Sequence, residues 1–144
     1  MREIKFRAWV KKREAMAFVS VMYLDKLKYH AAVELNYPFN RKIEKTREIV
    51  NLSEVELMQF TGLKDRKGRE IYEGDIVKRY HRITDDEFLC EVVYRQSCCQ
   101  FVLRVVETCI DVGKNEIFEL SQSVARNCKV VGNIHENKEL LNEN

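Results

Sequence analysis

Apolar and polar residues alternate at the start of the chain, as they do in a half-buried β-strand. Ile4, Phe6 and Ala8 fall on one side of such a strand over residues 4–10, and charged residues occupy positions between them. After a charged turn, residues 15–24 are rich in the apolar residue types that favour strands. The pattern therefore predicts two successive strands within the first 24 residues.

The following segment fits two patterns. Residues 27–35 alternate as a strand would, but Leu27, Ala31 and Leu35 also fit the apolar stripe of a helix. We interpret the segment as a strand. Residues 36–48 contain the single proline of the chain and several basic residues. This stretch is predicted to be an exposed loop.

The second half of the chain contains short apolar segments separated by turn residues. Residues 63–71 are typical of a tight turn, because Asp65 can accept a hydrogen bond from the backbone two residues on and Gly68 can take a positive φ. A second turn, over residues 72–77, leads into another strand. The other predicted elements are strands over residues 57–61, 88–94, 99–106, 117–120 and 129–134, and a short helix over 138–141 capped by Asn137.

Many short strands with almost no helix predict a mainly β fold. We expect an N-terminal β lobe over residues 1–56, followed by a small SH3-like β-barrel lobe over residues 57–144 that ends in the short C-terminal helix. One continuous domain over residues 1–141 is the alternative. If the register of the barrel strands is right, four apolar residues are buried: Phe60, Ile71, Ile76 and Val77.

Composition narrows the class of protein. Apolar residues make up 45% of the chain, which is enough for a packed core, and no apolar run is long enough to span a membrane. The first residues carry no apolar segment of the kind that a secretory signal needs. An odd number of cysteines and no CxxC pair predict free, buried thiols in a reducing cytosol, without a metal. These cysteines are Cys90, Cys98, Cys99, Cys109 and Cys128.

Charge is distributed unevenly along the chain. Residues 1–50 carry 12 basic and 6 acidic side chains, whereas residues 51–144 carry 13 basic and 17 acidic ones. The basic half can meet nucleic acid or the acidic half of a neighbouring copy. We also expect residues 102–106, which carry little charge, to form an open strand edge. Both features favour a homo-oligomer.

Three blocks of the sequence resemble one known family. Residues 57–77 resemble the central motif of the YopX family, and residues 1–9 and 131–141 resemble its start and its C-terminal motif. The resemblance implies a small phage or prophage protein of bacteria, and it carries no established biochemical activity. Two positions depart from the family pattern: Val10 stands where an acidic residue is usual, and Lys138 where proline is usual.

Two carboxylates lie close together in the block Glu73-Gly74-Asp75. Acid–base catalysis needs such groups to converge on a substrate with different pKa values, and nothing in the sequence indicates convergence. We interpret the block as a structural turn, in which Gly74 supplies a positive φ and Asp75 binds nearby amides. No serine, histidine or glycine pattern for nucleophilic, metal or phosphate chemistry is present. We therefore expect neither an enzyme nor a cofactor.

Basic residues with a tyrosine among them surround the two turns. Such side chains can neutralise phosphates while an aromatic ring stacks on a base. Interspersed acidic residues and a pI near 8.2 argue against a dedicated nucleic-acid-binding protein. The candidate contact residues are Lys64, Arg66, Lys67, Arg69, Lys78, Arg79, Tyr80 and Arg82.

These observations favour a non-catalytic accessory protein that binds other macromolecules or assembles with itself. The expected partners are a second copy of the chain and a phage or host protein. A nucleic-acid-binding β-barrel module is the alternative. We expect a cytoplasmic location in the bacterial host and no membrane partner.

Overall fold

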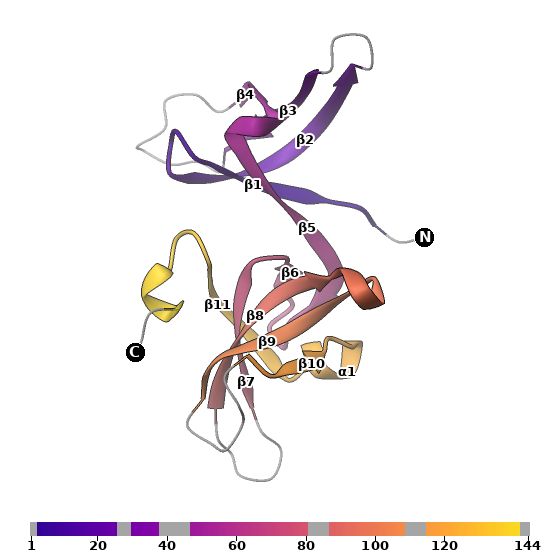
Figure 1. Ribbon diagram of the computed structural model, residues 1–144, viewed down its shortest axis with the longest axis vertical. Helices are drawn as coiled ribbons and strands as arrows, with labels where there is room; N and C mark the ends of the chain where they lie inside the picture. Colours follow the sequence, from indigo (N-terminus) through magenta and orange to yellow (C-terminus); the bar gives the residue numbers. More distant parts are fainter. Residues whose placement is uncertain (1–2, 26–29, 38–46, 81–86, 109–114, 142–144) are drawn as a thin grey trace. The chain divides into compact units, whose positions relative to one another are not determined.

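The part of the chain that the structure describes is mainly β, with two antiparallel sheets and one short α-helix (Figure 1). The computed structural model describes residues 3–25, 30–37, 47–80, 87–108 and 115–141. Within it, residues 3–59 form one compact unit and residues 60–144 contribute to the other. We describe the units separately, as the N-terminal unit and the C-terminal unit.

The first sheet has the strand order β4-β3-β2-β1-β5-β6. Its first five strands are β1 (Phe6–Val10), β2 (Ala15–Asp25), β3 (His30–Asn36), β4 (Arg47–Asn51) and β5 (Val55–Lys64), with a 3₁₀ turn η1 (Leu52–Glu54) before β5. β5 begins in the N-terminal unit and continues into the C-terminal unit. Alternate residues of the strands fill the N-terminal core, which consists of Ala8, Val10, Ala17, Val33, Leu35, Tyr37 and Val55.

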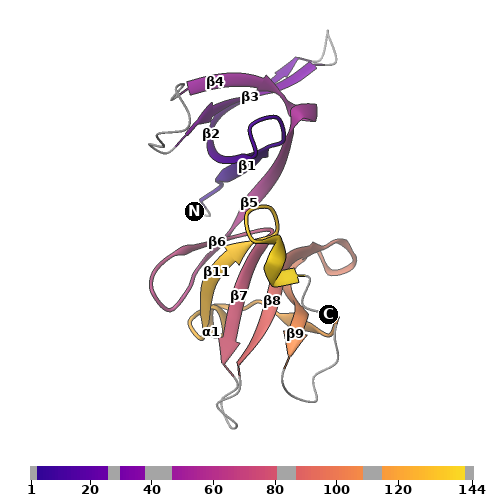
Figure 2. The same ribbon diagram turned by 90° about the vertical axis from the view of Figure 1, so that its left-hand side faces the viewer.

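The C-terminal unit contains the short strand β6 and a five-stranded sheet with the order β10-β9-β8-β7-β11. Figure 2 shows β7, β8 and β11 side by side. The elements are β6 (Glu70–Tyr72), β7 (Asp75–Tyr80), β8 (Glu87–Arg95), η2 (Gln96–Cys98), β9 (Gln100–Thr108), β10 (Ile117–Glu119), α1 (Gln122–Ala125), β11 (Cys128–Asn133) and η3 (Lys138–Leu141). Their core side carries, among others, Val77, Cys90, Val92, Leu103, Val105 and Val130.

The predicted mainly β class is confirmed, but the closed barrel is not. In the described residues, the five strands form an open sheet, because no ladder joins the end strands β10 and β11. The open edge predicted at residues 102–106 was also wrong. β9 is an inner strand, since it pairs with β8 on one side and with β10 on the other.

Two strands occur where the sequence predicted none. The expected exposed loop over residues 36–48 is wrong at Asn36, which ends β3, at Tyr37, which is buried, and at Arg47 and Glu48, which begin β4. Residues 38–46 lie outside the described part. Opposite charges explain this strand, because Arg47 pairs with Glu34 across the ladder and Glu48 accepts a hydrogen bond from Arg13 at 2.6 Å. The strand β6 likewise lies within the stretch that we predicted to be a turn.

Among the shorter elements, one prediction is confirmed, one is wrong and one helix was not predicted. The ambiguous segment is a strand where it is described, as we interpreted it. The C-terminal helix is a 3₁₀ turn, and the side-chain oxygen of Asn137 accepts from the Asn133 amide at 3.3 Å instead of capping that turn. The α1 helix was not predicted, although the Ser121 hydroxyl accepts from the Val124 amide as an ordinary N-cap does.

The turn at Gly74 has the expected geometry. Gly74 has a φ of +75°, its amide donates to the Val92 carbonyl at 2.8 Å, and the Asp75 carboxylate accepts from the Tyr72 amide at 2.8 Å. The four apolar residues predicted to be buried are all less than 4% exposed: Phe60, Ile71, Ile76 and Val77. The register predicted for this part of the sheet is therefore confirmed.

We predict that Gly74→Ala lowers the free energy of unfolding by about 1–3 kcal/mol, because a side chain is strained at this positive φ. Urea unfolding followed by circular dichroism measures the change. Glu73→Ala, at the neighbouring position, is the control and should change stability by less than about 0.5 kcal/mol. Equal midpoints for the glycine variant and the wild type would contradict the role of the turn.

Candidate functional site

Asp65 begins the tight turn between β5 and β6, and its carboxylate is buried. One oxygen accepts from the amides of Lys67 at 2.8 Å and Arg69 at 2.9 Å, and the other accepts from the amide of Val130 in β11 at 3.0 Å. Burial raises the pKa of Asp65, but the three backbone hydrogen bonds outweigh it, so the net pKa lies below the ordinary value of 3.8. The carboxylate thus fixes the turn and attaches it to a strand 65 residues away.

The Gly74 turn is attached to the end of β11 in a similar way. The amide of Ile134 donates to the Gly74 carbonyl at 2.9 Å, and the Asn133 side-chain oxygen accepts from the amides of His135 and Glu136. A Cβ on Gly132 would lie 2.4 Å from the Asn137 side-chain oxygen, so the close packing needs glycine there. The central and C-terminal blocks of the resemblance therefore meet in structural contacts.

Two of the candidate nucleic-acid residues stack on each other. The Arg66 guanidinium lies 4.3 Å from the centre of the Tyr80 ring and donates to the Tyr80 hydroxyl at 2.9 Å. Beside them, the Lys78 ammonium lies 2.6 Å from the Glu87 carboxylate. This hydrogen bond raises the pKa of Lys78 and lowers the pKa of Glu87. Of the three charged side chains in this group, Glu87 is thus acidic.

The other candidate residues separate. Lys64 and Lys67 are exposed near the turn, while Arg69 is exposed and donates to the Val130 carbonyl at 3.2 Å. Arg79 lies on the core side of β7, where its guanidinium carbon is 4.6 Å from the Phe118 ring centre. Arg79 is separated from Lys78 and Tyr80 because neighbouring residues of a strand point to opposite faces of the sheet. Arg82 lies outside the described residues.

The cysteines fall into two groups. Burial raises the pKa of Cys90 to about 12 and that of Cys128 to about 11, so both thiols are protonated and unreactive at neutral pH. Cys98 and Cys99 are exposed in the β8–β9 turn, where Cys99 has a left-handed backbone, so the prediction of buried thiols is wrong for this pair. Cys109 lies outside the described part. Among the described residues, no group of three or more His, Cys, Asp or Glu side chains is placed to hold a metal.

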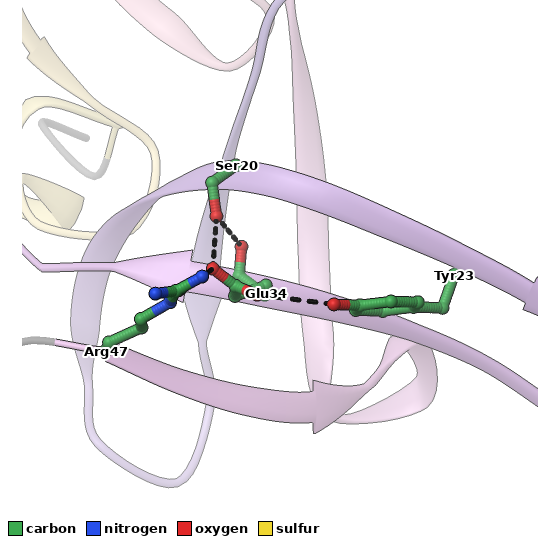
Figure 3. Close-up of polar contacts among 4 residues, drawn as sticks. All are labelled: Ser20, Tyr23, Glu34 and Arg47. Carbon is green, nitrogen blue, oxygen red and sulfur yellow. Dashed lines mark hydrogen bonds and ion pairs between the residues drawn. The ribbon is translucent and has the colours of Figure 1, made fainter.

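A polar cluster in the N-terminal unit escaped the sequence analysis. Figure 3 shows the Glu34 carboxylate in contact with side chains from β2 and β4. Arg47 forms an ion pair with it, the Ser20 hydroxyl donates at 3.1 Å, and the Tyr23 hydroxyl donates at 3.3 Å. Glu34 is only 5% exposed, and these contacts, with the Arg47 hydrogen bond first, lower its pKa.

A β-bulge in β2 makes this cluster possible. The register between β2 and β3 shifts between Val19 and Val21, which leaves Ser20 as the extra residue. Ser20 donates to both the carbonyl and the carboxylate of Glu34. After the shift, Val21 lies opposite Glu34 and therefore shares its side of the sheet. The bulge therefore shifts the alternation along β2. Before it, Phe18 lies on the side of Glu34; after it, Val21 and Tyr23 do.

Apolar side chains surround the cluster on the side of the sheet opposite to the N-terminal core. Phe18 is 51% exposed, Tyr23 45% and Ile49 61%, and Val21 is exposed as well. The ladder places these residues on one side, since Phe18 pairs with Asn36 while Val21 and Ile49 both pair with Glu34. We call this surface the Glu34 face, defined as Phe18, Val21, Tyr23, Glu34, Arg47 and Ile49.

Local sequence signals of this face were present but ambiguous. Phe18, Val21 and Tyr23 stand in a stretch that is apolar at nearly every position, so alternation alone cannot tell which residues point outward. The isolated Glu34 within an apolar segment was the one available signal, because a carboxylate there needs partners. Its partners lie 11 to 14 residues away along the chain.

Comparison with known proteins gives one family and two similar solved structures. The sequence model described as YopX protein matches residues 5–142. The crystal structure of protein EF1440 from Enterococcus faecalis is 29% identical, with a TM-score of 0.61 over 98% of this chain and 99% of that one. The crystal structure of protein yopX from Bacillus subtilis is 20% identical, with a TM-score of 0.58 over 97% of each chain, which shows a similar fold. No curated protein matches the sequence.

No helix within the described ranges has the length and apolar character needed to cross a membrane.

We predict that Asp65→Asn lowers the free energy of unfolding by about 1–3 kcal/mol at neutral pH, because the carboxamide replaces one acceptor oxygen with a donor that faces backbone amides. Since the folded pKa of Asp65 lies below 3.8, its stabilisation is complete above that pH and is lost as the pH falls through the folded pKa. The variant should therefore lose less stability than the wild type on acidification below about pH 4.

Urea unfolding at neutral pH and at a series of acid pH values measures both effects. Glu119→Gln, at an exposed carboxylate in the same unit, serves as the control and should leave stability unchanged. A variant with the same stability and the same acid sensitivity as the wild type would show that the three hydrogen bonds contribute nothing.

Proposed function

The chain belongs to the YopX family, and from this premise we propose that it is a non-catalytic phage or prophage accessory protein that works by binding another protein. The Glu34 face supports this proposal. Contiguous apolar patches on a monomer often mark interaction sites, and aromatic residues, Met and Arg are enriched where proteins bind each other. Phe18, Tyr23 and Arg47 give the face this composition.

The charge on the same side of the sheet favours a protein over a nucleic acid. Four charged residues with described side chains occupy this side in the ladder: Arg7, Glu34, Arg47 and Glu56. Their formal charges cancel, and Lys11, whose ammonium lies 3.7 Å from the Glu56 carboxylate, leaves a sum of only +1, whereas binding to a phosphate backbone needs a larger excess of positive charge. Val21 and Ile49 are aliphatic, so they fit an apolar protein surface better than the stacked bases of a nucleic acid.

We predict that Phe18→Ser weakens partner binding at least tenfold, because truncating a central aromatic anchor typically costs more than about 1 kcal/mol. The tagged wild type is used to isolate partners from phage-infected bacteria, and each partner found is then titrated with purified protein. Tyr94→Ser is the matched control, since Tyr94 is 46% exposed in the C-terminal unit. A partner that binds both variants as well as the wild type would contradict binding through this face.

Nucleic-acid binding is the second candidate, and the stacked Arg66 and Tyr80 side chains favour it. An arginine on an aromatic ring can contribute both a charge and a stacking surface. Lys64 and Lys67 are exposed on the adjoining turn, which the Asp65 carboxylate fixes. Against this candidate, Lys78 is neutralised by Glu87, and Arg79 lies on the core side.

If the chain binds nucleic acid, we predict that Lys64→Ala and Lys67→Ala together weaken binding to single-stranded DNA and reduce its dependence on salt. A shift assay across about 50–200 mM salt measures this. Lys138→Ala, at an exposed lysine of η3 that is not among the candidate contacts, is the control. Absence of any shift for the wild type at the lowest salt would eliminate this candidate.

A further inference from the structure

We propose that the occupant of the Glu34 face is a second copy of the same chain, packed face to face across a two-fold axis. The inference rests on the proposed function, because it assigns a partner to the same surface. Two-fold dimers are the commonest homo-oligomers, and their interface uses the same patch on both copies. Two twisted sheets pack in this way by interdigitating the side chains of their facing sides.

The charges on this side of the sheet suit self-association. Arg7 and Arg47 balance Glu34 and Glu56, and Lys11 beside Glu56 adds one positive charge at the end of β1, so two copies meet with little net repulsion. The carboxylate of Glu34 is already paired with Arg47 within each copy. Burial of the face would therefore add no unpaired charge from this cluster, which would otherwise oppose docking.

The position of the apolar residues favours face-to-face packing over edge-to-edge pairing. β4 ends the sheet, so a second copy could extend the ladder there. Phe18 and Tyr23, however, lie on β2, which β3 separates from that edge. Pairing at the edge would leave both aromatic rings exposed, whereas packing of the two faces covers them together with Ile49.

The size of the face sets the expected strength. An aromatic side chain buries about 150–250 Å² in total, so the half-exposed Phe18 and Tyr23, together with Val21 and Ile49, offer roughly 300 Å² of apolar area. A standard interface buries about 800 Å² per partner. Arg47, whose side chain is 69% exposed, adds to the area at the rim. Because the apolar area is well below this standard, we expect a weak, reversible dimer, which is tested at micromolar concentrations and above.

Sedimentation equilibrium from about 1 to 200 μM tests the inference, in reducing buffer because Cys98 and Cys99 are exposed. The mass of the wild type should rise from 17.1 kDa toward twice that value. Ile49→Lys and Phe18→Ser should each weaken association at least tenfold. Ile117→Lys is the matched control, since Ile117 is 40% exposed on β10, and it should associate like the wild type.

The outcomes separate this inference from the proposed function. A wild type that stays at 17.1 kDa throughout overturns the second copy as occupant, and so does association that neither face variant weakens. A monomer that still binds a partner protein through Phe18 leaves the proposed function in place. Circular dichroism of each variant confirms folding, and Phe18→Ser, which removes no hydrogen bond, provides the result if Ile49→Lys fails to fold.

Discussion

The need to satisfy a buried carboxylate shapes both units of this protein. Removing a charged carboxylate from water is unfavourable unless hydrogen bonds or an ion pair replace the lost hydration. Glu34 meets this need with side chains from the two strands that flank its own, and Asp65 meets it with three backbone amides. In each case the partners lie on different elements, so satisfying one charge fixes how those elements pack.

The surface of the N-terminal unit follows from the position of Glu34. Its oxygens need the Ser20 hydroxyl, which the β2 bulge provides, and they need Arg47, which brings the edge strand β4 into register. The same bulge turns Val21 and Tyr23 away from the core. The bulge that gives Glu34 its hydrogen bond from Ser20 thus also creates the apolar surface around Glu34. The core on the other side of the sheet is already filled, so this surface is available to a partner.

The C-terminal unit uses its characteristic residues for structure. Gly74 and Asp75 form a turn that is bonded to Val92 and Ile134, and Asp65 reaches Val130. The contact between Gly74 and Ile134 joins the central and C-terminal blocks that resemble the YopX family. The family resemblance therefore reports on how this unit folds, while the Glu34 face lies in a part of the chain outside those blocks.

Sequence reasoning succeeded where a local rule decides the structure. Gly74 and Gly68 have the positive φ that their turns require, and Asp65 binds the amide two residues on. It failed where distant contacts decide. β4 forms because Arg47 and Glu48 find partners elsewhere in the unit, and the stretch around Val102 pairs with β10, the next strand in chain order. The Glu34 face could not be predicted from the sequence for the same reason, because the bulge in β2 changes the alternation that tells outward from inward residues.

Methyl spectra of the isotopically labelled protein over a dilution series test most directly that the Glu34 face docks a second copy of the chain. The account predicts that the methyl signals of Val21 and Ile49 shift or broaden as concentration rises, and that those of Ile4 and Ile117, which are exposed elsewhere, stay constant. Shifts confined to Ile117 or its neighbours, or unchanged signals at every concentration, would contradict the account.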